Sequence, residues 1–388
     1  MKKAVFAVIT VLMVFCFAFT ANAEDKTIEV KLNNMALTFD VKPANIQGRV
    51  LVPLRVIFEQ LGMDVDWVAA TKTVTGSKNG NTVKLVQDST DAYVNGALVK
   101  LDVPAQIIGG RTMVPVRFIA ESTGAKVFWD SASQTVYIST STDQTITLEK
   151  ILLSAHYSDE GYKLGENGNT SEAIVNYDKA MEIDPFNYSA HYLKGRQFIS
   201  EKKYTEAIAC IDEAVKINSC DYEAYEFKGS ALYSLEKYSE AAACYETAVQ
   251  LNKEKILPAL LNILGDFLSG KDKYEEAISF YDIVIKYYKT DIYEAYNKKG
   301  NALRRLDRVE EALTCYDKAI AVKPKYADAY INKGNAYREL GNQVESLKCF
   351  DKAIELAPAN SYAYLLLYIW TWSTASSRTS FHLMPKLQ

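Results

Sequence analysis

The segment YEAYNKKGNALRRLDRVEEALTCYDKAIAVKP, residues 293–324, decides the fold of more than half of the chain. Its Gly300 is one of six glycines separated by 34, 34, 36, 35 and 34 residues; the others are Gly161, Gly195, Gly229, Gly265 and Gly334. A period near 34 residues is typical of a helical solenoid, in which each unit buries its apolar face only by stacking on its neighbours. The spacing therefore predicts stacked helix pairs that form a binding scaffold rather than a catalytic pocket.

Further positions recur together with these glycines. When each unit is numbered from the residue seven before its glycine, positions 20 and 27 are small and position 24 is large and mostly aromatic, as in Ala312, Ala319 and Tyr316. Small residues let two helices approach closely, the large residue fills the remaining space, and a proline such as Pro324 ends the second helix. Two extra residues near 256–257 are expected to lie in a turn.

This combination resembles the tetratricopeptide repeat (TPR), with six units over residues 154–360. The resemblance implies an all-α superhelical solenoid whose first helices line a groove for another polypeptide. We expect residues 140–153 to be a linker that precedes it.

Residues 27–139 have a different pattern. Apolar and polar residues alternate, and the Asn79-Gly80 and Asn95-Gly96 pairs predict hairpin turns between strands. Two short helices are expected behind Pro53 and Pro115, because proline favours the first position of a helix.

The two helical segments belong to an internal duplication. Eight residues of the first copy, Gly48-Arg49, Val52-Pro53, Arg55, Glu59, Gly62 and Trp67, recur with an offset of 62 as Gly110-Arg111, Val114-Pro115, Arg117, Glu121, Gly124 and Trp129. Arginine and glutamate four residues apart are expected to pair on a helix face. Both tryptophans are expected in the core rather than in a ligand-stacking role.

This duplicated pattern resembles the copper amine oxidase N-terminal-like domain, also called the stalk domain. The resemblance implies an α+β fold of antiparallel sheet and two short helices, without copper and without oxidase chemistry. Domains of this kind are common in exported proteins of Gram-positive bacteria.

The N-terminal residues predict export, and the C-terminal residues depart from the repeat pattern. Residues 1–23 are expected to be a signal peptide, since Lys2 and Lys3 precede an apolar run and Ala21-Asn22-Ala23. Residues 361–388 are expected to form an incomplete seventh repeat and an atypical tail, whose apolar run suggests a truncated end or a shifted reading frame.

The amino-acid composition disfavours some classes of binding partner. The chain of 388 residues carries 44 basic and 48 acidic residues, and loss of Lys2 and Lys3 with the signal peptide would leave 42 against 48, a net charge of −6. This mild acidity disfavours nucleic acid or anionic lipid. After signal cleavage no apolar stretch is long enough to span a membrane.

The sequence offers no catalytic or metal-binding constellation. The three histidines, His156, His191 and His382, lie far apart in the sequence, and neither a nucleophile elbow nor a phosphate-binding glycine motif occurs. Four of the cysteines share one repeat position, where packing is the simpler role and a disulfide ladder is not expected. We therefore expect no enzyme activity, no cofactor and no metal.

The candidate binding residues lie on the first helices of the last two full repeats. Asn297, Asn301 and Arg304 are spaced four and three apart, so they share a helix face, and Asn335 and Arg338 repeat the positions of Asn301 and Arg304. Asparagine amides can bond an extended peptide backbone and arginine can hold a carboxylate. The alternative is a solvated helix face, and the earlier repeats do not continue the pattern.

The resulting hypothesis is an exported, non-enzymatic scaffold. Its TPR groove would bind a partner protein or peptide, and its N-terminal domain would associate with the cell envelope or provide spacing from it. One alternative is a cell-wall polysaccharide-binding protein that uses exposed aromatics such as Tyr93 or Tyr137, with the repeats as a spacer. Another is an accessory subunit of an exported enzyme.

Overall fold

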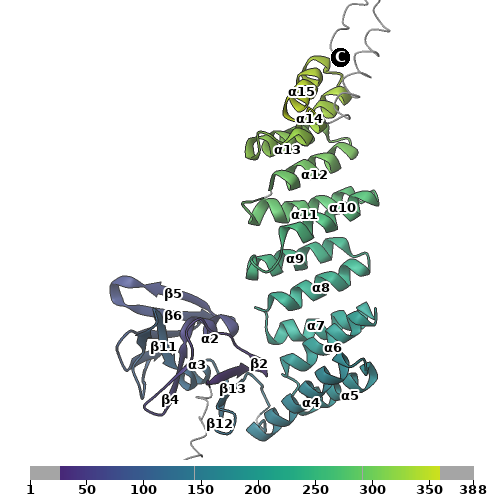
Figure 1. The fold of residues 1–388 in the computed structure, drawn as a ribbon. Coiled ribbons are helices and arrows are strands. Elements are labelled where there is room, and N and C mark those ends of the chain that lie inside the picture. Colours follow the sequence, from purple (N-terminus) through teal and green to yellow (C-terminus); the bar gives the residue numbers. More distant parts are fainter. Residues whose placement is uncertain (1–26, 144, 291, 359–388) are drawn as a thin grey trace, which may run out of the picture. The chain divides into compact units, whose positions relative to one another are not determined.

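The computed structural model describes residues 27–143, 145–290 and 292–358 (Figure 1). The signal peptide expected at 1–23 and the tail expected at 361–388 lie outside these residues. The chain divides into two compact units, Met1–Cys220 and Asp221–Gln388. Each is described by itself below.

The first unit begins with a β-rich domain of three sheets. The central sheet has the strand order β10 (Gln106–Ile108), β11 (Arg111–Pro115), β4 (Arg49–Pro53) and β3 (Ala44–Ile46). A second has the order β5 (Asp64–Val68), β6 (Thr73–Lys78), β7 (Asn81–Val86), β8 (Asp91–Val94) and β9 (Ala97–Lys100). The third has the order β12 (Lys126–Asp130), β13 (Thr135–Ser139), β1 (Glu29–Leu32) and β2 (Met35–Ala36). All pairings are antiparallel except β1 with β13, which is parallel.

The duplication organises the central sheet. Strands β4 and β11 pair antiparallel with Val52 opposite Val114, and these two residues are themselves 62 apart. Two exposed ion pairs then cross between the halves, Arg49 with Asp102 at 2.7 Å and Arg111 with Asp40. Because both the arginines and the aspartates differ by 62, the two pairs are equivalent. The halves are therefore intertwined about a local two-fold relation.

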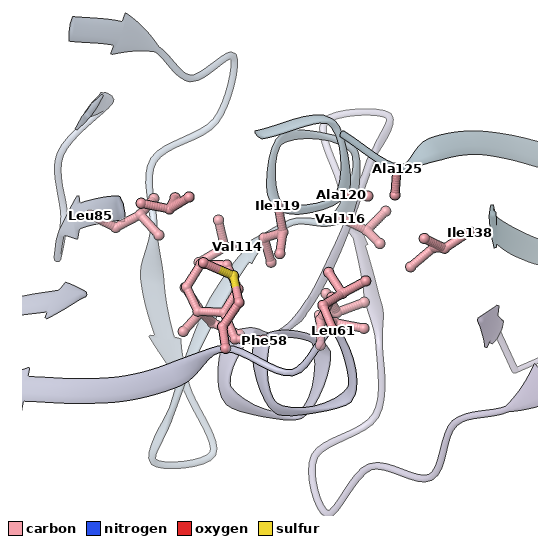
Figure 2. Close-up of a cluster of buried hydrophobic side chains, with 14 of the residues drawn as sticks. Phe58, Leu61, Leu85, Val114, Val116, Ile119, Ala120, Ala125 and Ile138 are labelled. Carbon is pink, nitrogen blue, oxygen red and sulfur yellow. The ribbon is translucent and has the colours of Figure 1, made fainter. Parts of the chain in front are cut away.

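The two short helices complete the domain core. They are α2 (Leu54–Gln60) and α3 (Val116–Ser122), each directly after a buried proline at the end of a strand. Figure 2 shows Phe58 of α2 and Ile119 of α3 pointing toward a common centre. The predicted pairs Arg55–Glu59 and Arg117–Glu121 form on the exposed faces of these helices, at 3.7 and 3.8 Å.

Two sequence expectations about aromatic residues need correction. Trp67 is 42% exposed on the edge strand β5, so it does not fill the core, whereas Trp129 packs against the core cluster. Tyr137 is buried with Ile146 and Ile151, so it is not available as an exposed aromatic. Tyr93 is half-buried.

Four helices of the repeat region follow in the first unit. They are α4 (Leu148–Glu166), α5 (Thr170–Ile183), α6 (Tyr188–Ser200) and α7 (Tyr204–Ile217). The first of them begins six residues before Ser154, inside the segment expected as a linker. The Thr147 side chain caps this helix by accepting from the Lys150 backbone N–H, and buried Ile151 anchors its first turns.

The second unit contains eight described helices, which stack in pairs (Figure 1). They are α8 (Tyr222–Ser234), α9 (Tyr238–Asn252), α10 (Pro258–Gly270), α11 (Tyr274–Tyr287), α12 (Ile292–Arg305), α13 (Val309–Val322), α14 (Ala327–Glu339) and α15 (Gln343–Leu356). Ile256 and Leu257 lie in the connection before α10, as expected for the extra residues. No helix among the described residues is both long and apolar enough to cross a membrane.

The glycines that set the period sit where the two helices of a pair touch. A Cβ built on Gly300 would lie 2.5 Å from Cε1 of Tyr316, and one on Gly334 would lie 2.6 Å from Cε1 of Phe350. The residue at position 24 makes this contact in every pair, and in the second pair it is Ile211. Glycine at position 8 is therefore required by packing rather than by backbone conformation.

Charged residues join successive pairs. Lys333 Nζ of α14 lies 2.6 Å from Asp317 Oδ1 of α13, and Lys299 with Asp282 repeats this pair one unit earlier. The aspartates on the second helices therefore hold the next repeat, instead of only facing solvent. Each contact is partly exposed and contributes modestly to stability.

Candidate functional site

The first helices of the last three described pairs form the floor of an open cavity. Helices α10, α12 and α14 lie side by side, because α12 contacts both of the others. The cavity has a volume of about 390 Å³. Its lining is mostly polar and consists of Asp266, Ser269, Gly270, Tyr274, Tyr281, Lys298, Asn301, Ala302, Arg304, Arg305 and Asn332.

Asp266 is fixed at one side of this cavity. Its carboxylate accepts a 2.9 Å hydrogen bond from Tyr281 Oη and contacts Lys298 Nζ at 2.7 Å. Burial raises the pKa of Tyr281, so its hydroxyl remains protonated and acts as a donor. The first of these contacts ties α11 to α10, and the second ties α12 to α10.

Asn301 is oriented by a buried tyrosine. Tyr316 Oη donates to Asn301 Oδ1 at 2.8 Å, and burial raises the pKa of Tyr316, which keeps the donor protonated. Among the described residues the amide nitrogen of Asn301 has no partner. Its two N–H groups are therefore available to a carbonyl oxygen in the cavity.

Arg304 is held by one end of its guanidinium. Its Nη1 donates to Glu339 Oε1, while its Nε is buried and lacks a hydrogen-bond partner in the described part of the chain. Burial lowers the pKa of Arg304, but Tyr316 and Glu339 more than offset this and raise it overall. A buried donor without a partner is costly, and because this nitrogen is closed to solvent it is not itself offered to a ligand.

Arg305 adds a second cation at the rim. Its Nε donates to Tyr274 Oη at 3.0 Å, and its guanidinium lies 3.8 Å from Asp272. Asp272 is exposed and Tyr274 is half-buried, so this arginine can exchange Asp272 for a carboxylate of a ligand.

Asn297 lies between helices rather than in the cavity. It is 5% exposed, its Oδ1 accepts from Asn332 Nδ2 at 2.9 Å, and its Nδ2 donates to Tyr326 Oη at 3.4 Å. These contacts join α12 to α14 and leave the amide little to offer a ligand. Asn297 therefore positions Asn332, which does line the cavity.

Asn335 and Arg338 also lie outside the cavity lining. Asn335 is 5% exposed, and its Oδ1 lacks a partner in the part of the chain that the structure describes. Arg338 is half-buried and forms no ion pair with any described residue. Of the five residues singled out from the sequence, the structure brings Asn301 and Arg304 together in one cavity.

Sequence reasoning missed most of the cavity. Lys298 and Asn332 both occupy position 6 of their repeats, one turn before Asn301 and Asn335 at position 9. A comparison of position 6 across the repeats would have found them. Asp266 stands at position 9, where it departs from the asparagine of Asn301 and Asn335, so the sequence pattern did not single it out. Tyr274 and Tyr281 come from a second helix, where the sequence gives no sign that they reach the groove.

The described residues show no arrangement for metal chemistry. They contain no group of three or more histidine, cysteine, aspartate or glutamate side chains able to hold a metal ion. The five described cysteines form no disulfide with one another, and burial raises the pKa of Cys315 and of Cys349.

Comparisons with protein families agree with both parts of this architecture. A model of the copper amine oxidase N-terminal domain matches residues 31–138. Models of TPR repeats match residues 228–291, 300–341 and 327–360, and a model of subunit 3 of the anaphase-promoting complex, cyclosome, matches residues 166–248. The chain therefore carries a copper amine oxidase N-terminal domain followed by TPR repeats, which confirms the two resemblances.

Individual relatives match parts of the chain. A protease inhibitor of Brevibacillus choshinensis is 30% identical over 138 residues, which are 35% of this chain and 42% of the relative. The chain thus matches less than half of the length of that curated relative. Among solved structures, one similar protein is YrrB, described as a TPR protein with an unusual peptide-binding site. It is 24% identical with a TM-score of 0.33, and the match covers 49% of this chain and 96% of the YrrB chain. The MamA protein is 21% identical with a TM-score of 0.28, and the match covers 60% of this chain and 98% of the MamA chain.

Proposed function

We propose that the protein is a non-enzymatic interaction scaffold whose TPR repeats bind an extended segment of a partner polypeptide. The observation that carries the proposal is the cavity on α10, α12 and α14, where the two amide N–H groups of Asn301 lack partners among the described residues. An extended backbone presents carbonyl oxygens that these donors can bond. Asn335 and Arg338 extend the same positions to α14.

The site of action proposed for this scaffold is outside the cytoplasm. The signal peptide predicted at 1–23 supports export, and the N-terminal domain would associate with the cell envelope of a Gram-positive bacterium or provide spacing from it. The net negative charge supports a polypeptide partner over nucleic acid.

A peptide array tests the proposal. Full-length protein is applied to an array of random decapeptides, and binding is compared with that of the Asn301→Ala variant. Asn176→Ala serves as the control, because Asn176 lies on the second helix α5 and its side chain bonds, among the described residues, to the Glu172 carbonyl oxygen of the same helix. We expect a subset of peptides to bind wild type and the control and to bind Asn301→Ala more weakly. Absence of any bound peptide would refute the proposal.

One observation favours a second candidate, polysaccharide binding by the β-rich domain. The Trp67 side chain is 42% exposed on β5 beside the 50% exposed Val68, and an exposed indole can stack on a sugar ring. Sedimentation of full-length protein with purified cell wall tests it. Loss of co-sedimentation in Trp67→Ala, with Tyr93→Phe unchanged, would support this candidate.

A further inference from the structure

Helix α10 carries exposed apolar side chains next to the polar cavity. Ile263 is 63% exposed and Phe267 is 51% exposed, and their spacing of four residues places them on one face of the helix. Phe267 is supported by Tyr233 of α8, with ring centroids 6.2 Å apart, and by Lys271, whose Nζ lies 4.7 Å from its ring centre. We call Ile263 and Phe267 the apolar step.

The repeat places the apolar step on the same surface as the cavity. Ile263 is equivalent to Lys298 of α12, and Phe267 is equivalent to Ala302 of α12. Both of these α12 residues line the cavity. The apolar step is therefore the next position along the groove, one repeat before the cationic part.

The charged side chains in the cavity lining indicate which charged group of a ligand could bind there. Its lining holds three cationic side chains, Lys298, Arg304 and Arg305, and one carboxylate, that of Asp266. Lys298 contacts this carboxylate, whereas the acidic partners of Arg304 and Arg305, Glu339 and Asp272, lie outside the cavity lining. A carboxylate of a ligand in the cavity would compete with these two partners for the arginines, most readily for Arg305, whose contact with Asp272 is long and exposed. The planar guanidinium group of arginine can donate two parallel hydrogen bonds to a carboxylate.

From this arrangement we propose that the groove recognises an extended segment with a bulky apolar side chain on the apolar step and a carboxylate at Arg304 and Arg305. Neighbouring helices pack about 8–10 Å apart and an extended chain advances about 3.3 Å per residue, so the two groups are about three residues apart in the ligand. This inference rests on the proposed function and adds the sequence class of the partner.

Four synthetic peptides test the inference. Each is an eleven-residue fluorescein-labelled peptide of serine, threonine and glycine, with phenylalanine or serine at the centre and aspartate or asparagine three residues to either side. The symmetric placement makes the test independent of chain direction. Fluorescence anisotropy with full-length protein measures the four affinities.

We expect the peptide with phenylalanine and aspartate to bind best, by at least about tenfold over the peptide with serine and asparagine. Phe267→Ser should abolish the preference for phenylalanine and keep the preference for aspartate. Arg305→Gln should abolish the preference for aspartate and keep the preference for phenylalanine. The control Val175→Ser removes a 51% exposed apolar residue of α5 and should change neither preference.

Other results would overturn the inference. Equal binding of all four peptides, or binding of none, contradicts it. If a ten-residue oligothymidylate bound as tightly and depended on Arg305, the groove would be a polyanion site instead. If the decapeptide array shows Asn301-dependent binding while the four peptides bind equally, the proposed function stands and only the sequence preference fails.

Discussion

Gly300 and Tyr316 are in such close contact that a single added methyl group would not fit between them. A Cβ on Gly300 would lie 2.5 Å from Tyr316 Cε1 and 2.9 Å from Cδ1. Tyr316 also donates to Asn301, the residue after this glycine. The contact that closes the helix pair therefore also orients a residue of the candidate site.

Gly300→Ala is expected to lower the free energy of unfolding by about 1–3 kcal/mol, because the ring of Tyr316 must shift. Denaturation followed by circular dichroism measures this change. The control is Gly270→Ala, where an added Cβ meets nothing within 4 Å. It should be neutral or stabilising by up to about 1 kcal/mol, since alanine favours helix. Equal loss in both variants would contradict this account of the glycine.

The two halves of the β-rich domain differ in where the large and the small residue lie at one equivalent pair of positions, one on the helix and one on a strand. A Cβ on Gly76 would lie 2.5 Å from Phe58 Cε2, so the large residue is on the helix and the small one on the strand. The equivalent positions, 62 residues later, are Ala120 on the helix and Ile138 on the strand, and both are buried (Figure 2).

An exchange of these residues is a direct test of that equivalence. Phe58→Ala alone should cost about 3–5 kcal/mol through the cavity it leaves, and Gly76→Ile alone should be destabilising through overpacking. The double variant reproduces the pair Ala120–Ile138 and should be more stable than either single variant. A double-mutant cycle on unfolding free energies measures the coupling, and simple additivity would refute the equivalence.

Asp184 is a buried carboxyl at the end of α5, 1% exposed, whose Oδ1 accepts from the Phe186 backbone N–H at 3.1 Å. Burial raises its pKa, and Asp143 adds to this, while the backbone hydrogen bond opposes it. Because the folded pKa lies above the unfolded value of about 3.9, this group supports folding at lower pH and loses that contribution as the pH rises through its folded pKa.

Asp184→Asn keeps the acceptor without the charge, so it should raise the unfolding free energy at pH 7 and give no gain at pH 3. The next repeat already uses asparagine here, since Asn218 Oδ1 accepts from the Cys220 backbone N–H at 3.0 Å. The reciprocal variant Asn218→Asp should be destabilised more at pH 7 than at pH 3. Thermal unfolding at the two pH values measures both, and a gain for Asp184→Asn that is independent of pH would contradict the argument.

The double variant Asn301→Ala, Asn335→Ala should weaken peptide binding by about 1–3 kcal/mol, at about 0.5–1.5 kcal/mol for each lost hydrogen bond. Isothermal titration with the tightest peptide from the decapeptide array measures it. The matched control is Asn176→Ala on α5. Unchanged affinity in the double variant would remove these two amides from the binding surface.

The parts of the fold with strict spacing could be predicted from the sequence. The glycine period gave the helix pairs because Gly300 and its equivalents each meet a large side chain, and the 62-residue offset gave the two helices behind Pro53 and Pro115. The cap at Thr147 is a local signal for the start of α4, but the burial of Ile151 with Tyr137 of β13, which anchors the first turns, is a tertiary feature that the sequence pattern did not show. The exposure of Trp67 was missed because the edge position of β5 depends on strand order, which no local pattern encodes.

The candidate site was only partly predictable for a related reason. Helical spacing placed Asn297, Asn301 and Arg304 on one face, but it could not show that Asn297 is bonded to Asn332 of the next repeat. Contacts between repeats decide which polar groups remain available. The cavity also depends on Tyr281, whose role becomes visible only through its hydrogen bond to Asp266.

If the groove of α10, α12 and α14 holds a polypeptide, a photo-crosslinking residue placed in it should capture one. Benzoylphenylalanine is placed at position 332, in the cavity, and at position 176 on α5 as a control. Full-length protein is irradiated with the random decapeptide pool, and the adducts are identified by mass spectrometry. We expect more peptide adducts at position 332 than at position 176, and we expect an excess of unlabelled binding peptide to suppress the adducts at position 332. Equal, unsuppressed adducts at the two positions would contradict binding of a polypeptide in the groove.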